Sequence, residues 1–146
     1  MRLTQYTDYS LRVLIYLAVH GRELTTIQEI TEAYGISRSH LMKVVQQLAR
    51  EGYVEAIRGQ GGGLRLRGEA AEINLGEVVR RMEPDFAFVE CFREGSHCAI
   101  ETACVLPAIL HRARQAFLAE LDRSTLADLA PRASSRKLVR LLGIDG

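Results

Sequence analysis

The first third of the chain carries apolar side chains at the spacing of amphipathic helices. We predict a first helix over residues 3–20, because Leu11, Leu14, Ile15 and Ala18 recur at helical spacing. A second helix is predicted over residues 26–34, since Thr26 and Glu29 have the spacing of a capping box. A glycine follows each of these two segments, and glycine commonly ends a helix.

A third helix follows after a turn formed by residues 34–37. Ser37 can cap this helix, Gly52 can end it, and its apolar positions are Leu41, Val44, Val45 and Leu48. Two short helices joined by such a turn form a helix-turn-helix. Because the second helix of this motif reads DNA, its outward side chains are candidate DNA contacts.

The period of the pattern changes after Gly52 from helical to alternating. Residues 53–58 and 64–67 are predicted to be short strands, and residues 59–63, Gly-Gln-Gly-Gly-Gly, form the turn between them. Four glycines in five positions indicate a tight turn or a backbone that approaches another molecule closely. We therefore predict a β-hairpin wing beside the helix-turn-helix.

The second half of the chain contains one long amphipathic segment. A short helix is predicted over residues 73–82, whereas residues 85–102 show no period and are interpreted as an ordered loop. A long helix is predicted from there to about residue 122, with an apolar stripe formed by Leu106, Ile109, Leu110, Ala113, Phe117 and Leu121. Because this stripe needs a partner, we predict a dimerisation helix.

Together these elements predict a mainly α-helical fold with a small β-hairpin. Residues 1–83 are expected to form a winged helix-turn-helix DNA-binding domain, residues 84–104 a cysteine-bearing loop, and residues 105–130 the dimerisation helix and the turn after it. Residues 131–146 are a basic C-terminal tail, and the pattern leaves open whether this tail packs on the rest. A length of 146 residues fits one such unit and leaves no room for a second large domain.

The formal net charge of +1 hides a local concentration of cations. Residues 36–67 contain six Arg and Lys against two Glu, a local charge of +4, whereas residues 1–35 carry three Arg against four acids. A phosphate-binding surface needs such clustering, although a solvated charged face without a partner is the alternative. The candidate DNA-binding residues are Arg38, Ser39, His40 and Lys43 of the third helix and Arg58, Gln60 and Gly61 of the wing.

All three cysteines lie in one stretch of fourteen residues, at Cys91, Cys98 and Cys104. No apolar run could span a membrane and no secretion signal is present, so we expect a cytoplasmic protein with reduced thiols. The cysteine spacing lacks the short knuckle of structural zinc sites and favours an iron–sulfur cluster, which usually takes four protein ligands. Three ordinary thiols are the alternative, and the candidate fourth ligands are His97, Glu101, His111 and Asp8.

These motifs together resemble the iron–sulfur winged-helix repressor family of the IscR and NsrR type. The resemblance covers about residues 1–130 and rests on the third helix, the wing, the cysteines and Thr125-Leu126-Ala127-Asp128-Leu129. Within the family the chain is most similar to the nitric-oxide-sensitive NsrR branch, through Tyr6-Thr7-Asp8 and Val89-Glu90-Cys91-Phe92. The IscR branch uses a histidine three residues after the last cysteine, where this chain has Pro107. The usual family wing, Gly-Pro-Gly-Gly-Gly-Tyr, is changed here at Gln60 and Leu64.

The resemblance implies a homodimeric transcriptional repressor that binds a palindromic double-stranded DNA operator. It implies an iron–sulfur cluster, [4Fe-4S] rather than [2Fe-2S], that is bound by Cys91, Cys98, Cys104 and Asp8 of the partner subunit. Nitrosylation by nitric oxide then releases the DNA and derepresses nitric-oxide detoxification genes. The alternatives are another cluster- or thiol-based redox or iron–sulfur-status regulator of IscR type, and a zinc or thiol-only redox repressor.

Other classes of function fit the sequence less well. A cysteine-nucleophile enzyme needs a base beside its thiol and a pocket, and only His97 next to Cys98 suggests the former. A cluster carrier would leave the cations of residues 36–67 without a role. We therefore predict a regulator and not an enzyme.

Overall fold

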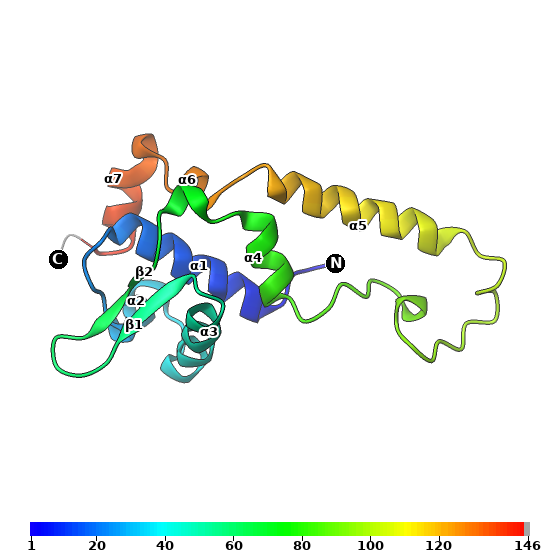
Figure 1. Ribbon diagram of the computed structural model, residues 1–146, viewed down its shortest axis with the longest axis horizontal. Helices are drawn as coiled ribbons and strands as arrows, with labels where there is room; N and C mark the ends of the chain where they lie inside the picture. The colour runs from blue at the N-terminus through cyan, green and yellow to red at the C-terminus, as the bar shows by residue number, and fades with distance from the viewer. Residues whose placement is uncertain (145–146) are drawn as a thin grey trace.

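The computed structural model describes residues 1–144, in which helices predominate and one antiparallel hairpin supplies the strands (Figure 1). The predicted fold class, mainly α-helical with a small β-hairpin, is confirmed. No helix in this described part combines the length and the apolar character that a membrane span requires. The elements are, in chain order, α1 (Gln5–His20), α2 (Ile27–Tyr34), α3 (Arg38–Arg50), β1 (Val54–Ile57), β2 (Gly63–Leu66), η1 (Ala70–Glu72), α4 (Leu75–Met82), η2 (Glu90–Phe92), α5 (Leu106–Asp122), α6 (Leu126–Leu129) and α7 (Arg132–Leu141).

Each of the first three helices begins directly after a capping side chain, and the sequence indicates two of these caps, Thr26 and Ser37. The side chains of Thr4, Thr26 and Ser37 each accept a hydrogen bond from the backbone N–H three residues later. Gly35 adopts the left-handed conformation, with φ of 65°, that ends α2. The first helix begins at Gln5, two residues later than predicted, because Thr4 is its cap and not part of the helix.

Helix α1 is covered on more sides than its apolar pattern indicates. Of the four apolar residues at helical spacing, Leu14 is buried, whereas Leu11, Ile15 and Ala18 are half-buried and pack against the core. Helices α3, α4, α6 and α7 and strand β2 all contact α1, so a single stripe cannot describe its burial. The residues of α1 that are buried are Thr7, Ser10, Val13, Leu14, Tyr16 and Leu17.

The hydrophobic core lies between α1, the helix-turn-helix, α4 and the base of the wing. It includes the predicted apolar face of α3, which is buried in full. Leu126 of α6 is also completely buried, so the chain returns to this core after α5. A capping box between Thr125 and Asp128 begins α6 at the predicted place.

The wing is an antiparallel hairpin attached to the rest of the domain by a third segment. Thr25 and Leu64 exchange two backbone N–H···O hydrogen bonds of 3.0 and 2.6 Å. Two wing glycines are required for close packing: a Cβ at Gly62 would overlap the carbonyl oxygen of Ile57, and a Cβ at Gly63 would lie 2.6 Å from that of Thr25. The glycine-rich sequence therefore serves a closely packed turn.

Helix α5 projects from the winged-helix unit, and the preceding segment loops around its far end (Figure 1). Between residues 84 and 105 the short η2 is the one regular element, in agreement with the predicted loop. The predicted stripe of α5 is divided between two faces. Leu110, Phe117 and Leu121 are half-buried, whereas Leu106 and Ile109 are each 48% exposed.

The basic C-terminal segment packs on the winged-helix unit. It forms α7, which contacts α1, and Leu142 and Ile144 pack against the core. This contact answers the question that the sequence left open for residues 131–144. The last two residues of the predicted tail, 145–146, lie outside the described residues.

Candidate DNA-binding surface and cysteine loop

Helix α3 presents its polar face to solvent. Because Leu41, Val44, Val45 and Leu48 point into the core, Arg38, Ser39 and Lys43 are exposed on the first turns of the helix. His40 differs from these residues, because its ring packs edge-to-face on Tyr9 of α1, with 4.8 Å between the ring centroids, and is half-buried. The structure thus leaves three of the four predicted contacts of α3 fully accessible and His40 partly accessible.

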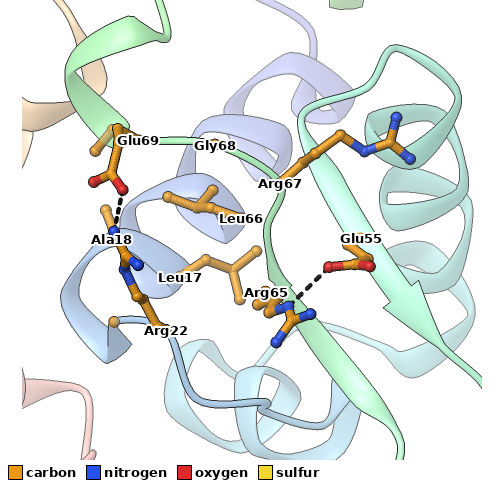
Figure 2. A pocket seen from close by; sticks show the side chains of 11 residues that line it. Leu17, Ala18, Arg22, Glu55, Arg65, Leu66, Arg67, Gly68 and Glu69 are labelled. Atoms are coloured by element: carbon orange, nitrogen blue, oxygen red, sulfur yellow. Dashed lines mark hydrogen bonds and ion pairs between the residues drawn. The ribbon is translucent and has the colours of Figure 1, made fainter.

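Carboxylates neutralise only some of the cations on this side of the molecule. Arg65 lies opposite Glu55 in the hairpin and forms an ion pair with it at 2.8 Å (Figure 2). Such pairing was not visible in the charge count from the sequence. The remaining cations have no carboxylate oxygen within 4.0 Å among residues 1–144, and they are Arg38, Lys43, Arg50, Arg58 and Arg67. Helix α3 and the wing therefore carry positive charge that no carboxylate of the described residues compensates.

The base of the wing borders a hollow of about 330 Å³ between α1 and β2 (Figure 2). Leu17 and Leu66 form part of its wall, and an ion pair between Arg22 and Glu69 closes one side. Arg67 points away from these pairs in the same view. Paired charges thus border the hollow: one pair links β1 to β2, and the other links the segment after α1 to the segment after β2.

The tip of the wing exposes the three residues predicted to contact DNA, Arg58, Gln60 and Gly61. Gly59 and Gly61 have positive φ values of 95° and 75°. Residues other than glycine rarely adopt a backbone conformation with positive φ. The two glycines therefore permit the tight turn. An exposed guanidinium at such a tip can reach a minor groove.

The cysteine loop, residues 84–104, carries three free thiols. Cys91 and Cys104 are half-buried and Cys98 is exposed. Among residues 1–144, no three His, Cys, Asp or Glu side chains are grouped so that they could hold a metal ion. One chain therefore does not bring the predicted ligands together.

The candidate fourth ligands have different surroundings. Asp8 lies in the first turn of α1, forms an ion pair with Arg12 at 2.8 Å and has a side chain that is 45% exposed. His97 and Glu101 are exposed in the cysteine loop. His111 of α5 has its Nδ1 2.8 Å from a guanidinium nitrogen of Arg114. Asp8 is thus an accessible carboxylate on the DNA-binding unit.

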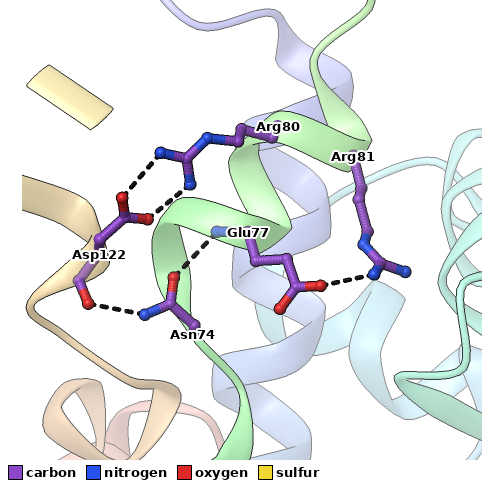
Figure 3. A network of polar contacts seen from close by, with 5 residues as sticks. All are labelled: Asn74, Glu77, Arg80, Arg81 and Asp122. Atoms are coloured by element: carbon purple, nitrogen blue, oxygen red, sulfur yellow. Dashed lines mark hydrogen bonds and ion pairs between the residues drawn. The ribbon is translucent and has the colours of Figure 1, made fainter. Parts of the chain in front are cut away.

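A polar network joins α4 to the end of α5 (Figure 3). Arg80 donates hydrogen bonds of 2.5 and 2.7 Å to the two carboxylate oxygens of Asp122, and the Asn74 amide donates to the Asp122 carbonyl at 2.7 Å. The Arg80 hydrogen bonds lower the pKa of Asp122 below its usual value. A Cβ at Gly76 would overlap the Asp122 carboxylate, so this glycine permits the close approach. Sequence reasoning missed this junction, and the glycine inside a helix was its one local signal.

The fold and the exposed cations define a winged helix-turn-helix protein with a DNA-binding surface. A family model described as Rrf2, iron-dependent transcriptional regulators, matches residues 3–132. The chain therefore belongs to the Rrf2 family of transcriptional regulators, and it is not an enzyme. The predicted resemblance to iron–sulfur winged-helix repressors is confirmed.

Similar proteins of known name agree with this assignment. The HTH-type transcriptional regulator NsrR of Bacillus subtilis is 53% identical over 131 residues, which cover 88% of this chain and 90% of the relative. The oxidized form of CymR from Staphylococcus aureus has a TM-score of 0.70 at 27% identity, covering 89% of this chain and 96% of that one. IscR from T. potens has a TM-score of 0.74 at 23% identity, covering 94% and 91%, and shows the shared fold.

The relatives also bear on the predicted function. The identity to NsrR proteins supports the prediction of a nitric-oxide-sensing transcriptional repressor over the IscR-like, zinc and thiol-only alternatives. The family implies an iron–sulfur cluster, and the three free cysteines are present for it.

Proposed function

We propose that two copies of this chain form a cytoplasmic repressor dimer on a palindromic DNA operator, and that an iron–sulfur cluster in each subunit controls operator binding. The cluster is [4Fe-4S] rather than [2Fe-2S], and its ligands are Cys91, Cys98, Cys104 and Asp8 of the partner subunit. Nitrosylation of the cluster releases the operator and derepresses nitric-oxide detoxification genes. The residues proposed to contact DNA are Arg38, Ser39, His40, Lys43, Arg58, Gln60 and Gly61.

The chemistry of the donor set is the observation that carries this proposal. Three free thiols lie within fourteen residues of one loop, and thiolates are the soft ligands that iron–sulfur clusters take. The three thiols fit such a cluster by their chemistry and are accessible or half-buried, and the loop that carries them has to bring them together when the cluster binds. They leave one ligand position for a group from elsewhere. When bound, the cluster supplies an iron that binds nitric oxide.

Asp8 suits that position because of where it lies. Its carboxylate is partly exposed and belongs to α1, which packs against α3. Ligation by Asp8 of the partner subunit would link the cysteine loop of one chain to the DNA-binding unit of the other. Loss of the cluster would then release a constraint on the DNA-binding unit.

The exposed face of α5 supports a dimer. No residue of this helix is buried, and Val105, Leu106 and Ile109 at its start are 73%, 48% and 48% exposed. Apolar side chains that line one face of a long helix in solvent are typical of a protein contact. Pairing of α5 with its copy would bury them. A dimer of this kind places two recognition helices about 34–36 Å apart, one turn of duplex DNA.

The decisive test of the function is operator affinity before and after nitric oxide. An operator is selected from random duplexes by the anaerobic holo-protein, and affinity is followed by fluorescence anisotropy. We expect stoichiometric nitric oxide to raise Kd by about tenfold or more. Apo-protein treated in the same way is the control for cysteine nitrosylation. Unchanged affinity of the holo-protein would exclude the mechanism.

Ligation across the dimer is tested by mixed dimers. Asp8→Ala and Cys104→Ala each remove one ligand, and both homodimers are expected to lose the native cluster spectrum. In a heterodimer with one subunit of each kind, ligation in trans leaves one complete site, whereas ligation in cis leaves none. We therefore expect about half of the wild-type iron in the heterodimer. Arg12→Ala is the matched control, because it breaks the Asp8 ion pair and keeps the carboxylate.

A further inference from the structure

Within residues 1–144, one side chain from outside the cysteine loop forms a hydrogen bond with it. Its own hydrogen bonds connect residues within the loop, such as the bond from the His97 N–H to the Glu90 carboxylate at 3.2 Å. Among the hydrogen bonds of the described residues, the one that reaches the loop from another element comes from Arg114 of α5. Its Nη1 donates to the carbonyl oxygen of Phe86 over 3.5 Å.

The same guanidinium makes a second contact with the loop, beside a predicted ligand. Its central carbon lies 5.3 Å from the centroid of the Phe92 ring, within the range of a cation–π interaction. Phe92 follows Cys91 directly, and both belong to η2. Arg114 therefore contacts both ends of the segment from Phe86 to Phe92, which contains Cys91.

A third contact orients Arg114 itself. One of its terminal nitrogens lies 2.8 Å from Nδ1 of His111, one turn earlier in α5. Because a guanidinium can only donate, His111 Nδ1 is the acceptor of this bond. His111 thus holds the Arg114 guanidinium in place, and its Nδ1 is engaged in this hydrogen bond.

We propose that Arg114 is the positioning residue of the cysteine loop, which holds Cys91 ready for the cluster. This inference rests on the proposed function. A loop that binds a cluster loses conformational freedom, and a residue that already restrains one ligand lowers that cost. Loop residues 85–89 line one hollow together with Leu110 and Phe117 of α5, and Arg114 sets the orientation of η2 beside it.

The first experiment uses apo-protein and does not depend on iron. The rate of alkylation of each cysteine is measured by mass spectrometry in wild type, Arg114→Gln and Arg112→Gln. Arg112 is the matched control, since it is exposed on the same helix and has no carboxylate oxygen within 4.0 Å in residues 1–144. We expect Arg114→Gln to raise the rate at Cys91 several-fold relative to Cys98, and the control to leave the ratio unchanged.

The second experiment measures cluster loss from anaerobic holo-protein in the presence of a chelator. Arg114→Gln is expected to lose the cluster absorbance about tenfold faster than wild type. Phe92→Leu, which removes only the cation–π contact, should give a smaller acceleration, and Arg114→Lys should lie between wild type and Arg114→Gln. Circular dichroism checks that each variant is folded. Phe92→Leu keeps the test usable if Arg114→Gln does not fold.

The outcomes separate this inference from the proposed function. A wild-type protein that holds no iron overturns the proposed function and the role of Arg114 toward a cluster. A wild type that holds a cluster, together with folded variants that lose it at the wild-type rate, overturns the role of Arg114 alone. Equal alkylation of Cys91 in wild type and Arg114→Gln overturns it as well.

Discussion

The winged-helix unit and the arm formed by the cysteine loop and α5 differ in how they bury apolar side chains. In the winged-helix unit Leu14, Leu41 and Leu48 have no exposed surface, whereas none of the 17 residues of α5 is buried. The first region has its own core, and core burial provides most of the free energy of folding. The second region keeps apolar side chains and thiols available for a partner. One chain thus combines a domain that buries its own hydrophobic core with an arm whose apolar side chains remain exposed.

The largest difference between the two regions should appear when the same kind of truncation is made in each. Leu41→Ala removes a fully buried side chain from α3 and is expected to lower the free energy of unfolding by about 2–5 kcal/mol. Ile109→Ala shortens a half-exposed side chain of α5 and should mainly weaken the dimer. Urea denaturation measures the first effect and sedimentation velocity the second. A similar loss of folding stability in both variants would contradict the comparison.

A smaller effect is expected for a single cation of the DNA-binding surface. Arg58→Gln removes an uncompensated charge at the wing tip. The slope of log K for DNA against log salt should become shallower by about 0.9 for each phosphate that the variant no longer neutralises, and the dimer has two wings. Arg112→Gln on α5 is the control and should leave the slope unchanged. If Arg58→Gln and Arg112→Gln have the same salt dependence, the wing does not contact the phosphate backbone of the DNA.

The smallest effect is expected at the junction of the two regions. The pKa of Asp122 is lowered by its hydrogen bonds from Arg80, so the folded state favours the charged carboxylate. The stability that this gives is present above the usual pKa of 3.8 and is lost as the pH falls through the lower pKa of the folded state. Apo wild type should therefore exceed Asp122→Asn in urea midpoint at pH 7 and approach it in acid. Glu120→Gln, at an exposed carboxylate nearby, serves as the control and should show little pH-dependent difference. If the difference in urea midpoint between wild type and Asp122→Asn persists below pH 3, the charged Asp122 carboxylate does not stabilise this junction.

The accuracy of the sequence-based prediction depended on the range of the interactions. The boundaries of α2 and α3 are set by caps and glycines within a few residues, and these boundaries were found to within about one residue. The apolar spacing of α1 indicates only part of its buried surface, because five elements cover this helix and the buried Thr7 and Ser10 are polar. The stripe of α5 was predicted as one surface, whereas the structure uses part of it within the chain.

The candidate site shows the same division. The cysteines and the exposed cations of α3 could be named from the sequence, since their residue types and spacing are local properties. The Arg65–Glu55 pair could also have been read from the register of the hairpin. Arg114 and its contacts with the loop could not, because they join residues as many as 28 positions apart.

The sequence by itself determined the helix-turn-helix, the wing and the thiols, because caps, turn glycines and side-chain chemistry act over a few residues. The tertiary structure alone decided which apolar faces are covered, and how α4 holds the end of α5 through the long-range Arg80–Asp122 pair. Burial and long-range ion pairing depend on which segments, far apart in the sequence, meet in space. A local sequence pattern does not encode these meetings. For this protein the difference is functional, since the face of α5 that the fold leaves uncovered is the one proposed to pair with a second copy.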